Sequence, residues 1–303
     1  MKTADVLEID HADSRPARAY PRADGLIVDL ISACLAIATF VMIAADSSWG
    51  ARAPIVLLFA LFVPGWTIVR SHEAPASAFT YIGAVGLSVG LLILLGEFLV
   101  LFGSWKWFPA GLVLAGGCGV VGIRSILRRN RELQISFRRP PWATRTAASD
   151  IARQISIGSV FAGNLLVALG IRHTRQQAFG VLGLVDVLAA AYWIGLVVLV
   201  GGLVTVCSRR SRWAWLNVAA LVAALHGLPG LLEPNPRFNV AWLHTGFVKQ
   251  IADHGTLLRG LDARFSWAGF FAGGGLIQRW TGTESLLWLV RYAPLFYNGA
   301  AVV

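Results

Sequence analysis

The chain has 303 residues, of which 56% are hydrophobic and only 14% are charged, and its mean hydropathy is +0.64. Soluble domains carry about 25% charged residues, so this composition excludes a soluble enzyme, a secreted disulfide scaffold and a disordered chain. The net charge of +10 would suggest a nucleic-acid partner in a soluble protein. Here the arginines cluster between apolar stretches, where positive charge sets orientation in a membrane. We therefore expect membrane lipid, and no nucleic acid, as a partner.

The chain opens on a polar tail, residues 1–25, which mixes acidic and basic side chains without a helical or strand period and predicts a disordered cytoplasmic segment. The apolar run at 26–45 has the length of a complete span, so it indicates a retained first span and not a cleaved signal peptide. Further stretches of about the length needed to cross the hydrocarbon are 53–69, 78–103, 110–127, 156–171, 179–207 and 213–232. The sequence thus predicts four spans within 26–127 and three within 156–232.

The charges of the connections predict the orientation. The segment 128–155 is a basic linker rich in arginine, and the short connection 208–212 holds three arginines. Basic connections stay in the cytoplasm, and alternate counting from a cytoplasmic N-terminus places both of these inside. We expect a multi-pass protein of the plasma membrane whose N-terminus is cytoplasmic.

The longest connection on the predicted outer face is 233–283. Within it, apolar residues recur at spacings of three and four, namely Val240, Leu243, Phe247 and Ile251. This pattern predicts an amphipathic helix over 239–254 that lies on the outer membrane surface, with Thr245 on another face.

Two stretches complete the chain. Residues 265–280 are aromatic and rich in glycine but short for a span, which predicts a half-buried or re-entrant helix. Residues 284–303 begin an eighth span and stop without a polar flank, so we expect a truncated span. The predicted fold is all-α, a polytopic integral membrane protein with about eight transmembrane helices and an outer-face amphipathic helix.

Ionisable residues inside spans need a reason, because a charge at a helix centre costs about 2.5–3.5 kcal/mol on insertion scales. Asp29 lies one turn from the cytoplasmic edge, where it reaches water, and is interpreted as incidental. The remaining three lie about 10 Å below the outer surface: Glu97, Asp186 and Arg291. They predict one outward-opening polar cavity in which the arginine offsets a carboxylate or meets a phosphate. Three unrelated residues that reach the headgroups are an equal alternative.

Glu233 follows the seventh span directly, with Pro234 and Pro236 beside it. A carboxylate held there can act as a general base toward a hydroxyl acceptor or can hold a divalent cation, although on the residues alone an ordinary loop carboxylate is favoured. Histidines near the outer face, with Asp253, match no strong metal-ligand spacing. We expect these histidines to bond their neighbours, and the metal ligands stay unknown.

Several stretches carry a resemblance to a family. They read HGLPGLLEPNPRFNVAWLHTGFVKQIADHG, LDARFSWAGFFAGGG and WTGTESLLWLVRYAPLFYNGA, with VPGW at 63–66 and LSVGLLILLGEFLVLFGSW at 87–105 further upstream. Together they resemble bacterial, actinobacterial-type multi-span proteins related to the GT-C glycosyltransferases, which use polyprenyl-phosphate-linked sugars. The chain looks like the N-terminal portion of such a protein.

The resemblance implies a role for each matching residue. Glu233 looks like the catalytic or metal-associated acid, Asp262 like the acidic residue before the aromatic segment, and Arg291 like the arginine that opens the next span. Asp253 to Gly255 look like the end of the surface helix in that family. The sequence departs from the family pattern at Ala268, where a proline is expected after tryptophan, and no DxD or ExD pair stands beside Glu233.

The leading hypothesis is an inverting transfer of a sugar from a polyprenyl-phosphate donor to a cell-envelope acceptor on the outer face. The expected catalytic residues are Glu233 and Asp262, and a divalent cation is the one cofactor considered. The expected substrate-binding residues are Arg291, Glu97, Asp186, His244 and His254. One alternative is a transporter or flippase of a lipid-linked precursor. Its intramembrane polar path would consist of Glu97, Asp186 and Arg291. Another is an inactive fragment with a scaffold role.

Overall fold

The computed structural model describes residues 23–72, 77–135, 147–174, 183–209, 211, 213–233, 235–236, 238–258, 260 and 262–302. The regular elements in these ranges are all helical, and seven helices are long and apolar enough to cross a membrane. The chain is therefore an all-α, multi-pass membrane protein, which confirms the predicted fold class. The predicted tail lies outside the described residues, except for its last three residues, which begin the first helix.

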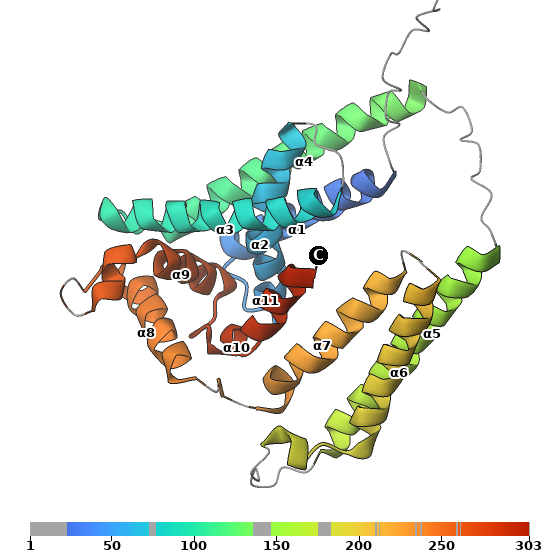
Figure 1. Ribbon diagram of the computed structural model, residues 1–303. Helices are drawn as coiled ribbons and strands as arrows, with labels where there is room; N and C mark the ends of the chain where they lie inside the picture. The colour runs from blue at the N-terminus through green and yellow to red at the C-terminus, as the bar shows by residue number, and fades with distance from the viewer. Residues whose placement is uncertain are drawn as a thin grey trace, which may run out of the picture.

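Four long helices form an N-terminal bundle: α1 (Ala23–Ala44), α2 (Arg52–Ser71), α3 (Ala78–Leu101) and α4 (Trp107–Ile135). In this bundle α1 packs against α4, and α2 crosses α3 and packs against it (Figure 1). They correspond to the first four predicted spans. The helix α4 continues past the predicted end of its span, because the residues that follow are mostly good helix formers. The part of the basic linker at 136–146 lies outside the described residues.

A second bundle contains α5 (Ala147–His173), α6 (Ala190–Ser208) and α7 (Ala214–Leu232), which run side by side (Figure 1). Small residues let α5 and α6 approach closely. A Cβ atom added to Gly195 would lie 2.7 Å from the carbonyl oxygen of Gly163. Such close backbone contact is the usual way in which membrane helices associate.

The predicted sixth span begins too early. A short 3₁₀ turn, η1 (Leu184–Asp186), precedes α6, and Gly183 before it has a φ of 65°. A left-handed backbone at this position ends any continuous helix. Asp186 therefore lies in an exposed turn outside the span, and the prediction that placed it within the membrane is wrong.

The connection after α7 forms α8 (Asn239–His254), then the 3₁₀ turn η2 (Ala263–Trp267), then α9 (Gly269–Thr281). The predicted helix over 239–254 is confirmed, but its buried face is rotated. Phe247 is buried as expected, whereas Leu243 is exposed and Thr245 is buried. The reason is tertiary: α8 packs against α9, and the contact is made by one side of its C-terminal half.

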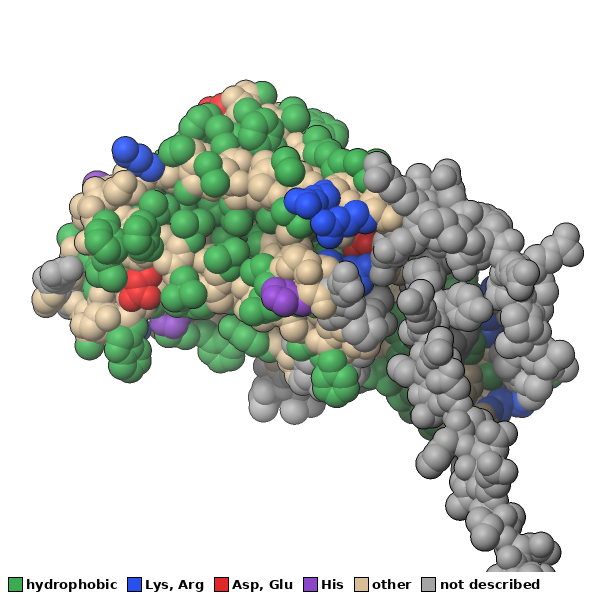
Figure 2. Space-filling model, turned by 90° about the horizontal axis from the view of Figure 1, so that it is seen from above, with side chains coloured by type: hydrophobic (Ala, Val, Ile, Leu, Met, Phe, Trp, Pro, Cys, Tyr) green, Lys and Arg blue, Asp and Glu red, His purple; other side chains and the backbone are tan. Residues whose placement is uncertain are grey.

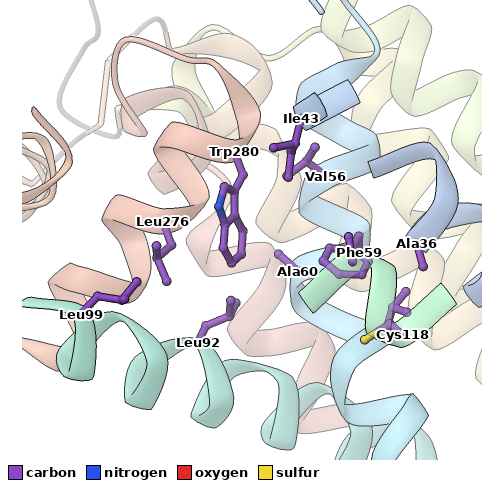
Figure 3. Packing of buried hydrophobic residues seen from close by; sticks show 12 residues of the cluster. Ala36, Ile43, Val56, Phe59, Ala60, Leu92, Leu99, Cys118, Leu276 and Trp280 are labelled. Carbon is purple, nitrogen blue, oxygen red and sulfur yellow. The ribbon is translucent and has the colours of Figure 1, made fainter. Parts of the chain in front are cut away.

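The helix α9 lies against the N-terminal bundle, where it contacts α3, α2 and α4. Figure 3 shows the Trp280 indole of α9 near Ile43 and Val56 of the α1–α2 hairpin, and this side chain is fully buried. A Cβ atom on Gly96 of α3 would lie 2.6 Å from the backbone nitrogen of Gly273, so glycine is required at this crossing. The predicted half-buried helix is thus enclosed on most sides. Its 13 residues extend only about 20 Å, too short for a span.

The final stretch does not form an eighth span. It is divided into α10 (Leu287–Val290) and α11 (Ala293–Val302), with Arg291 and Tyr292 between them. Pro294 stands in the first turn of α11, where a proline is tolerated because that N–H has no intrahelical partner. The helix α11 packs against α7.

The long helices expose large apolar side chains on their outer faces. Leu94, Val113 and Val197 are 66%, 74% and 70% exposed. Figure 2 shows hydrophobic side chains over most of one face, with few charged groups among them. A soluble protein rarely exposes so large an apolar area, whereas lipid tails cover it at no cost.

Pro64 lies inside α2, next to the closest contact between α2 and α3. The proline removes a backbone donor from the helix interior, and the next N–H, that of Gly65, donates to Ser88 Oγ of α3 at 2.8 Å. The two helices meet so closely here that a Cβ atom on Gly65 would overlap the carbonyl oxygen of Ala84. Glycine is needed for this contact and not for backbone conformation.

We predict that Gly65→Ala lowers the unfolding temperature in detergent by several degrees, because overpacking of a core costs about 1–3 kcal/mol. The matched control is Gly86→Ala on α3, where nothing lies within 4 Å of an added Cβ. The control should leave the temperature unchanged or raise it, since alanine favours a helix over glycine. Equal effects of the two substitutions would show that the α2–α3 contact is not tight.

Candidate functional site

A cavity of about 280 Å³ lies at the C-terminal end of α3, between this helix and the segment that connects α8 to α9. Its polar lining comes from Glu97, Asp262 and Ser266, and its apolar lining includes Phe265. The structure thus brings together two carboxylates that are far apart in sequence. A hollow with few polar groups and an aromatic wall is typical of a small-ligand site.

Glu97 lies one turn before the end of α3 and is half-buried. The helix α9 begins beside it, since a Cβ atom on Gly269 would lie 2.8 Å from Glu97 Oε2. The positive end of a helix dipole favours a carboxylate at this place. Within the described part of the chain, no hydrogen bond or ion pair to this carboxylate is formed. Its oxygens therefore remain available to a ligand in the cavity.

Asp262 has a different environment, because it caps η2 and is bound by Arg264. Its Oδ1 accepts hydrogen bonds from Arg264 N at 2.9 Å and Nε at 2.8 Å, and its Oδ2 accepts one from Nη2 at 2.8 Å. These hydrogen bonds from Arg264, with a smaller contribution from the charge of His244, lower the pKa of Asp262 to about 2. Asp262 is therefore a fixed, ionised group whose charge is largely offset by its partner.

The two expected histidines lie apart on α8. The His244 ring is 5.4 Å from the ring of Phe271 and belongs to an aromatic cluster with Phe247 and Phe265 behind the cavity wall. His254 is exposed at the helix end, with its Nδ1 3.2 Å from the carbonyl oxygen of Gln250. Among the described residues, no group of three or more His, Cys, Asp or Glu side chains is placed to hold a metal ion. The divalent cation considered from the sequence gains no support.

Glu233 and Arg291 form a second polar group, at the end of α7. Arg291 Nη1 donates to the carbonyl oxygen of Glu233 at 3.1 Å, and the guanidinium lies 5.6 Å from the ring centre of Tyr292. A cation at a helix C-terminus stabilises the exposed carbonyls there. These two residues are therefore close, but neither lines the cavity of Glu97 and Asp262.

The prediction that Glu97, Asp186 and Arg291 share one cavity is wrong. Glu97 faces the cavity at α3, Arg291 lies at the end of α7, and Asp186 lies in the exposed turn before α6. The shared depth came from treating 179–207 and 284–303 as straight spans. Neither stretch is a single helix, so equal distance along the sequence does not give equal depth.

Asp29, interpreted from the sequence as incidental, is buried and fully engaged. Its Oδ1 accepts hydrogen bonds from Trp66 Nε1 at 3.0 Å and from Arg70 Nε at 3.1 Å, and its Oδ2 accepts one from Arg70 Nη2 at 3.2 Å. A buried charge has to be paired because the isolated ion is costly in a low dielectric. Opposite charges at equal depth in adjacent antiparallel spans are the sequence signal that identifies this pair.

The loop that carries Asp262 is held by contacts at the end of α8. The Ala252 carbonyl oxygen accepts hydrogen bonds from Trp105 Nε1 at 3.1 Å and Arg279 Nε at 2.7 Å. Asp253 pairs with Lys249 at 2.8 Å and Arg279 at 3.3 Å, and the hydrogen bond from Lys249 is the main cause that lowers the pKa of Asp253. These contacts fix the end of α8 against the connection between α3 and α4 and against α9.

The Asp262 pKa predicts a pH dependence. Because the folded-state pKa, about 2, is below the ordinary value of 3.8, the ionised carboxylate stabilises the fold above pH 3.8, and this contribution disappears as the pH falls through about 2. Arg264→Gln should raise the titration midpoint of Asp262 toward 3.8, as measured by NMR of ¹³C-labelled carboxyl groups in micelles. Lys249→Gln is the matched control and should move Asp253 but not Asp262. An unchanged midpoint in Arg264→Gln would contradict the assigned hydrogen bonds.

Comparison of the chain with family models, curated proteins and solved structures gives no match. What the site does must therefore be inferred from its own chemistry. The cavity combines one open carboxylate, one neutralised carboxylate, a hydroxyl and an aromatic ring at the end of a membrane helix. This combination suits a small polar ligand that carries hydroxyl groups.

Proposed function

We propose that this chain is a membrane-embedded, glycosyltransferase-like protein that transfers a sugar from a polyprenyl-phosphate donor to a cell-envelope acceptor on the outer face. The observation that carries the proposal is the cavity at the end of α3, with its open Glu97 carboxylate. Carboxylates and hydroxyls bind sugar hydroxyl groups, and Leu101, 52% exposed, supplies an apolar surface in the same cavity. The pattern resemblance in the sequence points to the same substrate class.

Exposed apolar residues border the cavity on both sides, which suits a lipid-linked ligand. On α3 these are Phe98 and Phe102, 56% and 72% exposed, whose rings lie 4.5 Å apart. On the other side Trp267 is 80% exposed, next to the cavity-lining residues Ser266 and Ala268. A polyprenyl chain can lie against these residues in the membrane while the sugar enters the cavity.

The transfer step needs a base and a stabilised leaving group. The acceptor hydroxyl oxygen attacks the anomeric carbon, the bond from that carbon to the phosphate oxygen breaks, and polyprenyl phosphate leaves with the electron pair. The acceptor proton passes to a carboxylate, for which Glu97 is the first candidate because Asp262 is neutralised by Arg264. Glu233, the other catalytic residue expected from the sequence besides Asp262, is the competing candidate, with Arg291 beside it for the phosphate.

One experiment separates these two candidates. In proteoliposomes that contain a polyprenyl phosphate bearing a tritiated hexose, we predict that Glu97→Gln lowers transfer by at least about 100-fold, the usual contribution of a general base. The matched control is Glu284→Gln, which removes an exposed carboxylate that does not line the cavity. The control should retain activity.

Loss of transfer in Glu233→Gln, with Glu97→Gln fully active, would move the base to the end of α7 and reject the cavity as the reaction site. A second readout does not depend on turnover: a polyprenyl phosphate with a diazirine on its chain should cross-link to peptides that contain Phe98 or Trp267. Cross-links confined to α5 and α6 would also reject the cavity.

The proposal requires the cavity to face outward, and the basic connection after α6 should then face the cytoplasm. On a background with the three native cysteines replaced, a membrane-impermeant maleimide added to intact cells should label Asn235→Cys and not Arg209→Cys. Labelling of Arg209→Cys alone would invert the topology and place Glu233 on the cytoplasmic side. Sugar transfer from an outer-face lipid donor would then be excluded.

The flippase alternative depended on a polar path through Glu97, Asp186 and Arg291. In the structure these residues lie at three separate places. These three residues therefore do not form the polar path on which the transport alternative rested.

A further inference from the structure

The C-terminal part of α4 carries a surface hollow that sugar transfer does not use. It has a volume of about 450 Å³ and is lined by Val120, Ile123, Arg124, Leu127 and Arg128. Spacings of three and four residues place all five on one side of the helix. The other side packs against α1, where a Cβ atom on Gly122 would lie 3.2 Å from Ala33 Cβ. The hollow therefore faces away from the bundle, toward the surrounding membrane.

The two arginines of this hollow differ from the other arginines near the bundle ends. Arg70 is paired with the buried Asp29, and Arg52 is paired with Asp46. By contrast, both Arg124 and Arg128 are exposed, and no carboxylate among the described residues lies within ion-pair distance of either. Two guanidinium groups one helical turn apart can bind the oxygens of one phosphate group.

The depth of the arginines identifies the kind of phosphate. Measured along α4 from Trp107, Arg124 lies about 25 Å and Arg128 about 31 Å away, against a hydrocarbon thickness of about 30 Å. Arg124 therefore starts inside the apolar layer, and its guanidinium extends to the headgroup level. The partner that a bilayer supplies at this level is a lipid phosphate.

The apolar part of the hollow fits the rest of the same molecule. Val120 and Ile123, 67% and 44% exposed, continue the hollow from Arg124 toward the membrane interior, and Leu127, 59% exposed, lies between the two arginines. An acyl chain attached to the bound headgroup would run along this line. We propose that the hollow on α4 is a binding site for an anionic phospholipid, with its phosphate between Arg124 and Arg128 and one chain against Val120, Ile123 and Leu127. The site is independent of the proposed sugar transfer.

The test uses the full chain in detergent, titrated with dioleoyl phosphatidylglycerol or with dioleoyl phosphatidylcholine, which has the same chains and no net charge. Native mass spectrometry counts the bound lipid. Wild type should bind phosphatidylglycerol in preference, and Arg124→Gln/Arg128→Gln should weaken this binding about 25-fold, at about fivefold for each arginine. The unfolding temperature of the variant should not change, because neither side chain has a described protein partner.

The matched control is Arg153→Gln/Arg209→Gln, which removes the same charge from the second bundle and should keep phosphatidylglycerol binding. If both double variants lost phosphatidylglycerol binding equally, the loss would be due to net charge alone, and the proposed site would be rejected. The acidic tail is the competing occupant. A variant with the tail carboxylates neutralised tests this occupant; the residues changed are Asp5, Glu8, Asp10 and Asp13. If phosphatidylglycerol bound only to this variant and not to wild type, the tail would be the occupant of the hollow and the lipid proposal would fail.

Discussion

The end of α9 is fixed inside the N-terminal bundle by two hydrogen bonds that meet at Trp280. Its indole Nε1 donates to the carbonyl oxygen of Trp107 at 2.8 Å, and its own carbonyl oxygen accepts from Arg52 Nε at 2.9 Å. Arg52 is buried and also donates to Asp46 Oδ1 and to the carbonyl oxygen of Ser47, so one cation joins α9 to the hairpin between α1 and α2. A buried guanidinium is stable only when several acceptors surround it, which makes this junction specific.

The position of α9 determines where the cavity is. Because the crossing of α9 over α3 depends on Gly96 and Gly273, the start of α9 lies beside Glu97, and η2 is carried against the end of α3. Phe265 of η2 then packs on Phe247 of α8 and forms the cavity wall. The open carboxylate is thus a product of helix packing. A span residue that would be unfavourable in lipid instead faces a polar hollow.

The arginines near the ends of the helices have two kinds of environment, which differ in what replaces their lost hydration. Arg52, Arg70 and Arg279 turn inward to carboxylates or to helix C-termini, where they replace lost hydration by hydrogen bonds. In the lipid site proposed above, Arg124 and Arg128 face the membrane, and lipid headgroups would provide that replacement. The same residue type therefore joins helices at one place and meets the bilayer at another, and a count of positive charges does not distinguish the two.

Much of the architecture follows from the sequence alone. Length and hydropathy of single stretches determine the seven long helices, because a span satisfies its own backbone and needs about 20 apolar residues. The amphipathic repeat of α8 and the position of Glu233 directly after a span are equally local. Only the tertiary structure decided the pairing of Asp29 with Arg70, the meeting of Glu97 with Asp262 and the separation of Asp186 from both. These depend on backbone breaks at Gly183 and Pro294 and on glycine contacts between helices distant in sequence, and hydrophobic periodicity contains no information on such contacts.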